Sequence, residues 1–182
     1  MKKLSLVLIV VLGLGVVSAG MVQADPITVG NPLWYAFLFG LPGPVAVGSS
    51  IANSTNPGNP PWTYTAATAT SVKITDSFSA GDMFSLYDFG TFIGTTSIVP
   101  TTAIGTTNPS PDADYLDPLL SHGLFTLAAG SHELTIQTFQ NAEGNTDGVA
   151  FFRVDAVPVP PSAWLMGSGL LGLLGWRRFR KV

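Results

Sequence analysis

Hydrophobic and polar side chains alternate along the middle of this chain with the period of two that a half-buried strand requires. Val72 and Ile74, for example, alternate with three polar neighbours in residues 71–75. Similar strand patterns lie in residues 83–87, 91–98, 124–127, 132–139 and 148–157. No window keeps a helical apolar spacing over three turns. The pattern therefore predicts an all-β fold, an antiparallel β-sandwich of jelly-roll type, in a single domain over residues 25–157.

Short connections and proline-rich stretches predict how these strands are joined. Residues 88–90 and 128–131 each contain a glycine and lie between two strand patterns, so we expect a hairpin at each. Residues 41–62 and 99–118 are rich in proline, and we expect them to form long surface loops. Loops of this length either carry the variable chemistry of a binding protein or are plain surface excursions.

The start of the chain has the organisation of a secretory signal peptide. Two lysines precede an apolar run over residues 4–17, and the sequence then becomes small and polar. We expect residues 1–24 to form a signal helix that directs the chain to the secretion machinery. Signal peptidase should cut between Ala24 and Asp25, with a cut after Ala19 as the second choice. A retained membrane anchor is the alternative, for which the apolar run is short.

The end of the chain combines a stiff spacer, an apolar helix and a basic cluster. The spacer consists of Val157, Pro158, Val159, Pro160 and Pro161. A helix over residues 162–176 would reach about 22 Å, against about 30 Å for the hydrocarbon core of a bilayer. The basic residues that follow it are Arg177, Arg178, Arg180 and Lys181. We therefore expect a short transmembrane helix whose basic end stays in the cytoplasm, with the preceding domain outside.

Residues 158–182 resemble the PEP-CTERM sorting tail, in which a proline motif, a glycine-rich apolar helix and terminal cations follow one another. The family motif reads Val-Pro-Glu-Pro, and Val159 stands at the glutamate position, which makes this a VPxP-type variant. The run Trp-Leu-Met-Gly-Ser-Gly-Leu-Leu-Gly at 164–172 is similar to the family helix. A simple tail anchor is the alternative, and the four glycines of the predicted helix argue against it.

This resemblance implies a destination and a partner. It implies processing by exosortase in the inner membrane of a Gram-negative bacterium, after which the protein reaches the cell surface or the extracellular matrix. It also implies a structural or interaction role in the exopolysaccharide or biofilm matrix. Residues 82–88, 94–97, 130–136 and 148–155 resemble, more loosely, the exported domains of such proteins, which supports a β-sandwich and implies no activity.

Charge and cysteine content exclude several classes of protein. Residues 25–157 hold all eleven acidic residues and two basic ones, which gives this stretch a formal charge of −9. A surface of that sign repels phosphate, so we expect no nucleic acid partner. The chain has no cysteine, which excludes a disulfide scaffold, a structural zinc–thiolate site and thiol catalysis.

Two acidic segments are candidates for calcium binding. Asp112, Asp114 and Asp117 lie close together, and clustered carboxylates suit a hard cation such as calcium. The alternative is a solvated turn with capping aspartates. Residues 143–148 resemble the opening of an EF-hand loop, but Val154 stands where that loop requires a bidentate glutamate, so we expect a polar turn there. No other cofactor is expected.

Aromatic residues make carbohydrate binding the alternative function. Trp62 and Tyr64 share one face of a predicted strand, and exposed rings stack on the C–H faces of sugars. Packing of both rings in the core is the competing interpretation. We expect no enzymatic activity and name no catalytic residue, because His122 and His132 have no metal-ligand spacing and no serine lies in a nucleophile elbow.

Overall fold

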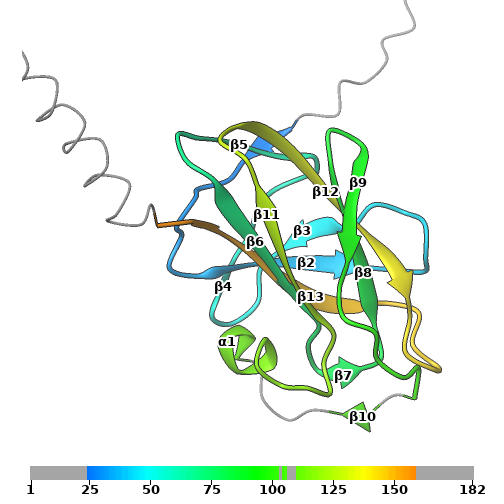
Figure 1. Ribbon diagram of the computed structural model, residues 1–182. Coiled ribbons are helices and arrows are strands. Elements are labelled where there is room, and N and C mark those ends of the chain that lie inside the picture. Colours follow the sequence, from blue (N-terminus) through cyan, green and yellow to red (C-terminus); the bar gives the residue numbers. More distant parts are fainter. Residues whose placement is uncertain (1–23, 103, 106–109, 159–182) are drawn as a thin grey trace, which may run out of the picture.

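The computed structural model describes residues 24–102, 104–105 and 110–158, whose strands form two main sheets (Figure 1). The first sheet has the order β1 (Asp25–Pro26), β5 (Trp62–Ala66), β12 (Gly130–Gln140), β8 (Met83–Asp88) and β9 (Thr91–Thr95). The second has the order β11 (His122–Leu127), β6 (Thr70–Thr75), β13 (Gly148–Ala156), β2 (Trp34–Phe39) and β3 (Val47–Ser49), and β4 (Ser54–Thr55) runs parallel to β2. The remaining described elements are the ribbon of β7 (Ser79–Ala80) with β10 (Ile104–Gly105) and the helix α1 (Pro111–Asp114).

Both sheets contribute alternating residues to a shared core, which confirms the all-β prediction and gives a β-sandwich. Leu134 and Ile136 of β12 are fully buried, as their spacing of two predicts. Trp62 of β5 lies 4.8 Å from the ring of Phe152 of β13, and Phe37 of β2 packs against both rings. Full burial of a large apolar side chain contributes roughly 1.5–3 kcal/mol, so such contacts across the sandwich hold the two sheets together.

Antiparallel pairs in the described domain are nested inside one another. The turn after β8 joins it to β9, and outside this pair β6 binds β11, β5 binds β12, and β2 binds β13. Successive pairs lie alternately in the first and the second sheet. The chain therefore folds as one long antiparallel hairpin that is rolled into two layers, with the β8–β9 turn at its tip.

One of the two predicted hairpins is correct and the other is wrong. β8 and β9 pair across the predicted turn, but β11 and β12 do not pair with each other. They belong to different sheets, and Gly130, the first residue of β12, has φ +142°, a conformation that glycine adopts without strain. The two proline-rich stretches also contain more structure than loops, since β3 and β4 lie in the first and α1 lies in the second.

The short helix α1 and the residues after it cover part of the outer face of the second sheet. Trp34 and Phe151 are buried on this face and pack against Tyr115, which directly follows α1. The indole N–H of Trp34 donates to Asp112 Oδ1 at 2.9 Å, and the guanidinium of Arg153 lies 4.7 Å from the indole ring. These contacts fix α1 on the sheet. They lie at the same end of the sandwich as β7 and β10 (Figure 1).

Candidate functional site

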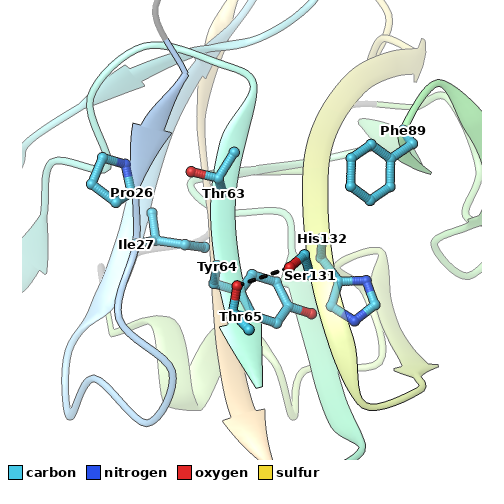
Figure 2. A pocket seen from close by; sticks show the side chains of 8 residues that line it. All are labelled: Pro26, Ile27, Thr63, Tyr64, Thr65, Phe89, Ser131 and His132. Atoms are coloured by element: carbon cyan, nitrogen blue, oxygen red, sulfur yellow. Dashed lines mark hydrogen bonds between the residues drawn. The ribbon is translucent and has the colours of Figure 1, made fainter. Parts of the chain in front are cut away.

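An open hollow of about 520 Å³ lies on the first sheet, beside the turn between β8 and β9 (Figure 2). Its volume is in the range of roughly 300–1,000 Å³ that is typical of small-ligand sites. β1, β5, β12 and the turn all contribute to it. The residues that line it are Pro26, Ile27, Thr63, Tyr64, Thr65, Phe89, Ser131 and His132.

Three hydroxyl groups on neighbouring strands give the hollow its polar side. Thr63 and Thr65 are two residues apart on β5, so they lie on the same face. Ser131 of β12 is in register with Thr65, and their hydroxyl oxygens are 3.0 Å apart. Each hydroxyl can donate one hydrogen bond and accept two, so this edge of the hollow can bind a ligand that is itself rich in hydroxyls.

A carboxylate clamp holds the turn beside the hollow. Asp88, the last residue of β8, accepts a hydrogen bond from the backbone N–H of Glu133 at 2.9 Å, and its other oxygen lies 2.8 Å from His132 Nδ1. His132 Nε2 lies 2.9 Å from the carbonyl oxygen of Ala128. The backbone N–H of Phe89 donates to the carbonyl of Glu133 at 2.9 Å. β12 therefore fixes the position of the turn through side-chain and main-chain contacts.

The aromatic residue of this turn has an unusual backbone conformation. Phe89 has φ +47° and Gly90 has φ +72°, so both residues of the two-residue turn are left-handed. Such turns favour Asn-Gly, because a left-handed backbone is strained for most residues with a Cβ atom. The side chain of Phe89 is nevertheless 59% exposed. The chain thus places a large apolar ring in solvent, at the edge of the hollow.

The two aromatic residues predicted to bind sugar do share one face of β5, but it is the inner face. Trp62 is 0% exposed and donates its indole N–H to the carbonyl of Gly58 at 3.1 Å, so it cannot stack on a ligand, and that prediction is wrong. Tyr64 is also buried, although it lines the hollow. Its hydroxyl lies 2.8 Å from Thr70 Oγ1, and burial raises its pKa above the ordinary value. Both rings belong to the core.

The three aspartates predicted to bind calcium point to three different partners, and the proposed calcium triad is therefore wrong. Asp112 is exposed and accepts hydrogen bonds from Trp34 and Arg153. Asp114 is buried and accepts one from the Ser77 hydroxyl at 2.6 Å. Asp117 accepts one from the backbone N–H of Leu119, two residues further on, which forms a local turn. Among the described residues, no group of three or more acidic or histidine side chains is arranged to hold a metal ion.

The other polar residues considered in the sequence analysis belong to connections or are bonded to the backbone. Residues 143–148 form the connection into β13, where Glu143 and Asp147 are exposed, in agreement with the expected polar turn. His122 begins β11, and its Nδ1 lies 3.1 Å from the carbonyl oxygen of Leu120.

A cluster of buried carboxyls at the opposite end of the sandwich was not predicted from the sequence. Asp76 and Asp82 are almost fully buried, and none of the ion pairs formed by the described residues includes either of them. Burial raises the pKa of Asp76 to about 8, and the nearby carboxyls of Asp82 and Asp114 add to this rise. Burial also raises the pKa of Asp82 and of Asp114, and hydrogen bonds from Ala142 and from Ser77 oppose it.

The predicted sorting and cleavage sites lie at or beyond the limits of the described domain. Ala24 and Asp25 stand at its start, where Asp25 begins β1, and Val157 and Pro158 follow the end of β13. The residues Val159, Pro160, Pro161, Arg177, Arg178, Arg180 and Lys181 lie outside the described residues, as do both predicted terminal helices. Within the described part of the chain, no helix combines the length and the apolar character of a membrane span.

Comparison with family models, with curated proteins and with solved structures found no match to this chain. The function therefore has to be inferred from the residues and their geometry.

Proposed function

We propose that this chain is an exported protein of the cell surface or the extracellular polysaccharide matrix, with a structural or interaction role there and no catalytic one. A signal peptide over residues 1–24 delivers it to the secretion machinery. The tail over residues 158–182 then holds it in the inner membrane of a Gram-negative bacterium, where exosortase, its processing partner, releases or transfers it. The proposal rests on the resemblance of this tail to PEP-CTERM signals.

The bounds of the described strands support this proposal. β1 begins at Asp25, directly after the expected cut, and β13 ends at Ala156, directly before Val157 and Pro158. The shared core consists of residues between Ile27 and Val154. Removal of both terminal segments therefore leaves the core of the described residues whole, as a processed export signal at each end requires.

The finer description of the domain as a jelly roll is supported by its nested pairs. A jelly roll is a two-sheet structure built from antiparallel strands, and in it a long hairpin is rolled so that neighbouring pairs alternate between the sheets. The pairs β8–β9, β6–β11, β5–β12 and β2–β13 follow this rule. We propose a helix at each terminus beside this domain, for the signal peptide and for the membrane segment of the tail.

Measurement of the C-terminal mass tests the proposed processing. The full chain is expressed in an exosortase-producing Gram-negative host and in the same host without exosortase. We expect the tail beyond the proline spacer to be lost only in the first host, and a Pro158→Ala, Pro160→Ala variant to be processed more slowly. A matched Pro109→Ala, Pro111→Ala variant, changed outside the tail, should be processed normally. An intact tail in the competent host contradicts the proposal.

Carbohydrate binding is the second candidate function, and the hollow on the first sheet favours it. The hollow combines three hydroxyl-bearing residues with an exposed phenyl ring, Phe89, and its volume suits one or two sugar residues. Affinity electrophoresis of the full chain through gels that contain soluble polysaccharide tests this role. Retarded migration that free polysaccharide reverses is the expected result, and unchanged migration in every gel contradicts the role.

A further inference from the structure

We propose that the hollow beside Phe89 binds a neutral sugar residue of a polysaccharide, with the Phe89 ring as its stacking platform. This inference rests on the carbohydrate-binding role proposed above, and it adds the location of the site and the class of sugar.

The conformation of Phe89 is the first observation behind this proposal. A left-handed backbone is strained for a residue with a Cβ atom, and asparagine or glycine would avoid most of that strain in this turn. Phe89 belongs to neither hydrophobic cluster of the described residues. Burial of the ring within the domain therefore does not offset the strain. Strain of this kind is concentrated at functional sites, and an exposed ring beside a hollow is suited to contact with a ligand.

The second observation is that the ring stands on a fixed base. Asp88 is held by Glu133 and His132 of β12, and the Phe89 backbone is bonded to the same strand. His132 in turn stacks on Tyr64 at 4.9 Å between ring centroids. Because the turn is anchored before any ligand arrives, little conformational freedom is lost on binding, as a preorganised site requires.

The third observation is the chemistry of the lining. Phe89 lies across β12 from Thr63 and Thr65 of β5 (Figure 2), so an apolar surface and a row of hydroxyls border the same hollow. A pyranose ring has the matching surfaces, because its C–H groups form an apolar face while its hydroxyls project from the edge. The Thr65 and Ser131 hydroxyls are exposed and bonded only to each other among the described residues, so both keep capacity for a ligand.

The charge of the site selects neutral sugars. No aspartate, glutamate, lysine or arginine is among the residues of the described domain that line the hollow. The domain as a whole carries a formal charge of −9, which repels uronates, sulfates and other anionic sugars. A neutral hexose unit is therefore the class of ligand that this site fits.

The Phe89→Asn variant separates a binding role from a structural one. The full chain in a mild detergent is titrated calorimetrically with soluble dextran, galactomannan and hydroxyethylcellulose, and with alginate as the anionic counterpart. We expect wild type to bind at least one neutral polymer and not alginate, and Phe89→Asn to bind it at least about tenfold more weakly. The same variant should melt at a higher temperature than wild type, because asparagine adopts the left-handed turn more readily.

A matched control and a second variant complete the test. Phe78 also has a left-handed backbone, with φ +65°, but it does not line the hollow, so Phe78→Asn should relieve strain and leave binding unchanged. Ser131→Ala removes one hydroxyl and should weaken binding several-fold without unfolding the domain.

Each other result overturns a defined part of the proposal. Binding of no neutral polymer by wild type contradicts both the carbohydrate-binding role and this inference. Equal binding by wild type and Phe89→Asn overturns the inference alone, because sugar is then held elsewhere. Preference for alginate overturns the neutral class, and a lower melting temperature of Phe89→Asn shows that the ring serves the fold.

Discussion

The carboxyl groups at the two ends of the sandwich have opposite kinds of surroundings. At the end with the hollow, Asp88 is bonded to the Glu133 N–H and to His132, and these contacts position an exposed ring. At the end with β7 and α1, Asp76 and Asp82 are buried and take part in none of the ion pairs among the described residues, and the pKa of both is raised. The first arrangement fixes the position of an exposed ring, whereas the second should make the stability of the fold depend on pH. Four substitutions test this comparison, from the largest expected effect to the smallest.

Removal of the clamp at the hollow should have the largest effect. Asp88→Ala leaves the Glu133 N–H and the His132 ring without their acceptor in a mostly buried position, so we expect a loss of about 2–4 kcal/mol in the free energy of unfolding. Urea denaturation of the full chain measures this loss. Asp147→Ala, at an exposed position, serves as the control and should change stability by less than about 0.5 kcal/mol. Equal stability of the two variants would show that the contacts of Asp88 with Glu133 and His132 do not stabilise the fold.

Substitution of the buried Asp76, at the end of the sandwich with β7 and α1, should stabilise the fold to an extent that depends on pH. Since the pKa of Asp76 is about 8 when folded and about 3.8 when unfolded, the unfolded state binds fewer protons between these values. Wild-type stability from this group is therefore full below about pH 4 and falls as the pH rises to 8. We expect Asp76→Asn to match wild type near pH 4 and to become increasingly more stable than wild type as the pH rises to 9.

Urea titrations of both proteins at several pH values measure this difference. Asp82→Asn, which changes the neighbouring carboxyl, should shift stability in the same direction. A difference between Asp76→Asn and wild type that stays constant from pH 4 to pH 9 would show that Asp76 titrates normally.

Relief of backbone strain at Phe78, at the end of the sandwich with β7 and α1, should raise the free energy of unfolding modestly. The N–H of Ser79 donates to the carbonyl of Ser77, which closes a tight turn around Phe78 at φ +65°. Phe78→Asn should add about 1 kcal/mol, or a few degrees in melting temperature, as followed by circular dichroism. Phe139→Asn, a change at a more exposed phenylalanine within β12, should bring no such gain. A lower melting temperature of Phe78→Asn would mean that packing of the ring outweighs the strain.

Loss of a hydroxyl from the open hollow should have the smallest effect on folding. Thr65 is exposed and bonded only to Ser131 among the described residues, so Thr65→Ala should change stability by less than about 0.5 kcal/mol. Thr70→Ala removes a buried partner of the Tyr64 hydroxyl and should cost about 1–2 kcal/mol in the same denaturation experiment. Similar losses at both positions would mean that Thr65 is needed for the fold.

The strands could be predicted because their signal is local, and their partners could not. Leu134 and Ile136 alternate with polar residues, so β12 can be recognised from its own sequence. Its neighbours in the sheet, β5 and β8, are set by contacts between distant parts of the chain. A short connection such as residues 128–131 is compatible with a hairpin or with a crossing between sheets, and the sequence alone favoured the wrong one.

The candidate site was only partly visible in the sequence. The aromatic residues of β5 suggested a sugar site on that strand. Which face of a strand is buried depends on the opposite sheet, and Trp62 lies on the buried face. The sequence places Phe89 in a predicted turn. It does not reveal the positive φ of this residue, because phenylalanine stands where asparagine is usual. Asp76 and Asp82 resemble ordinary turn residues in the sequence, and only the fold buries them.

The position of β13 in the second sheet has a consequence for the order in which the chain folds. The strand β13, Gly148–Ala156, lies between β6 and β2. Each of these two strands therefore has one unpaired edge until β13 is synthesised and binds to it. A chain that leaves the ribosome or a translocation pore from its N-terminus cannot close the sandwich before residue 156 has emerged. The topology thus requires nearly the whole domain before the second sheet is complete, which suits the export proposed above.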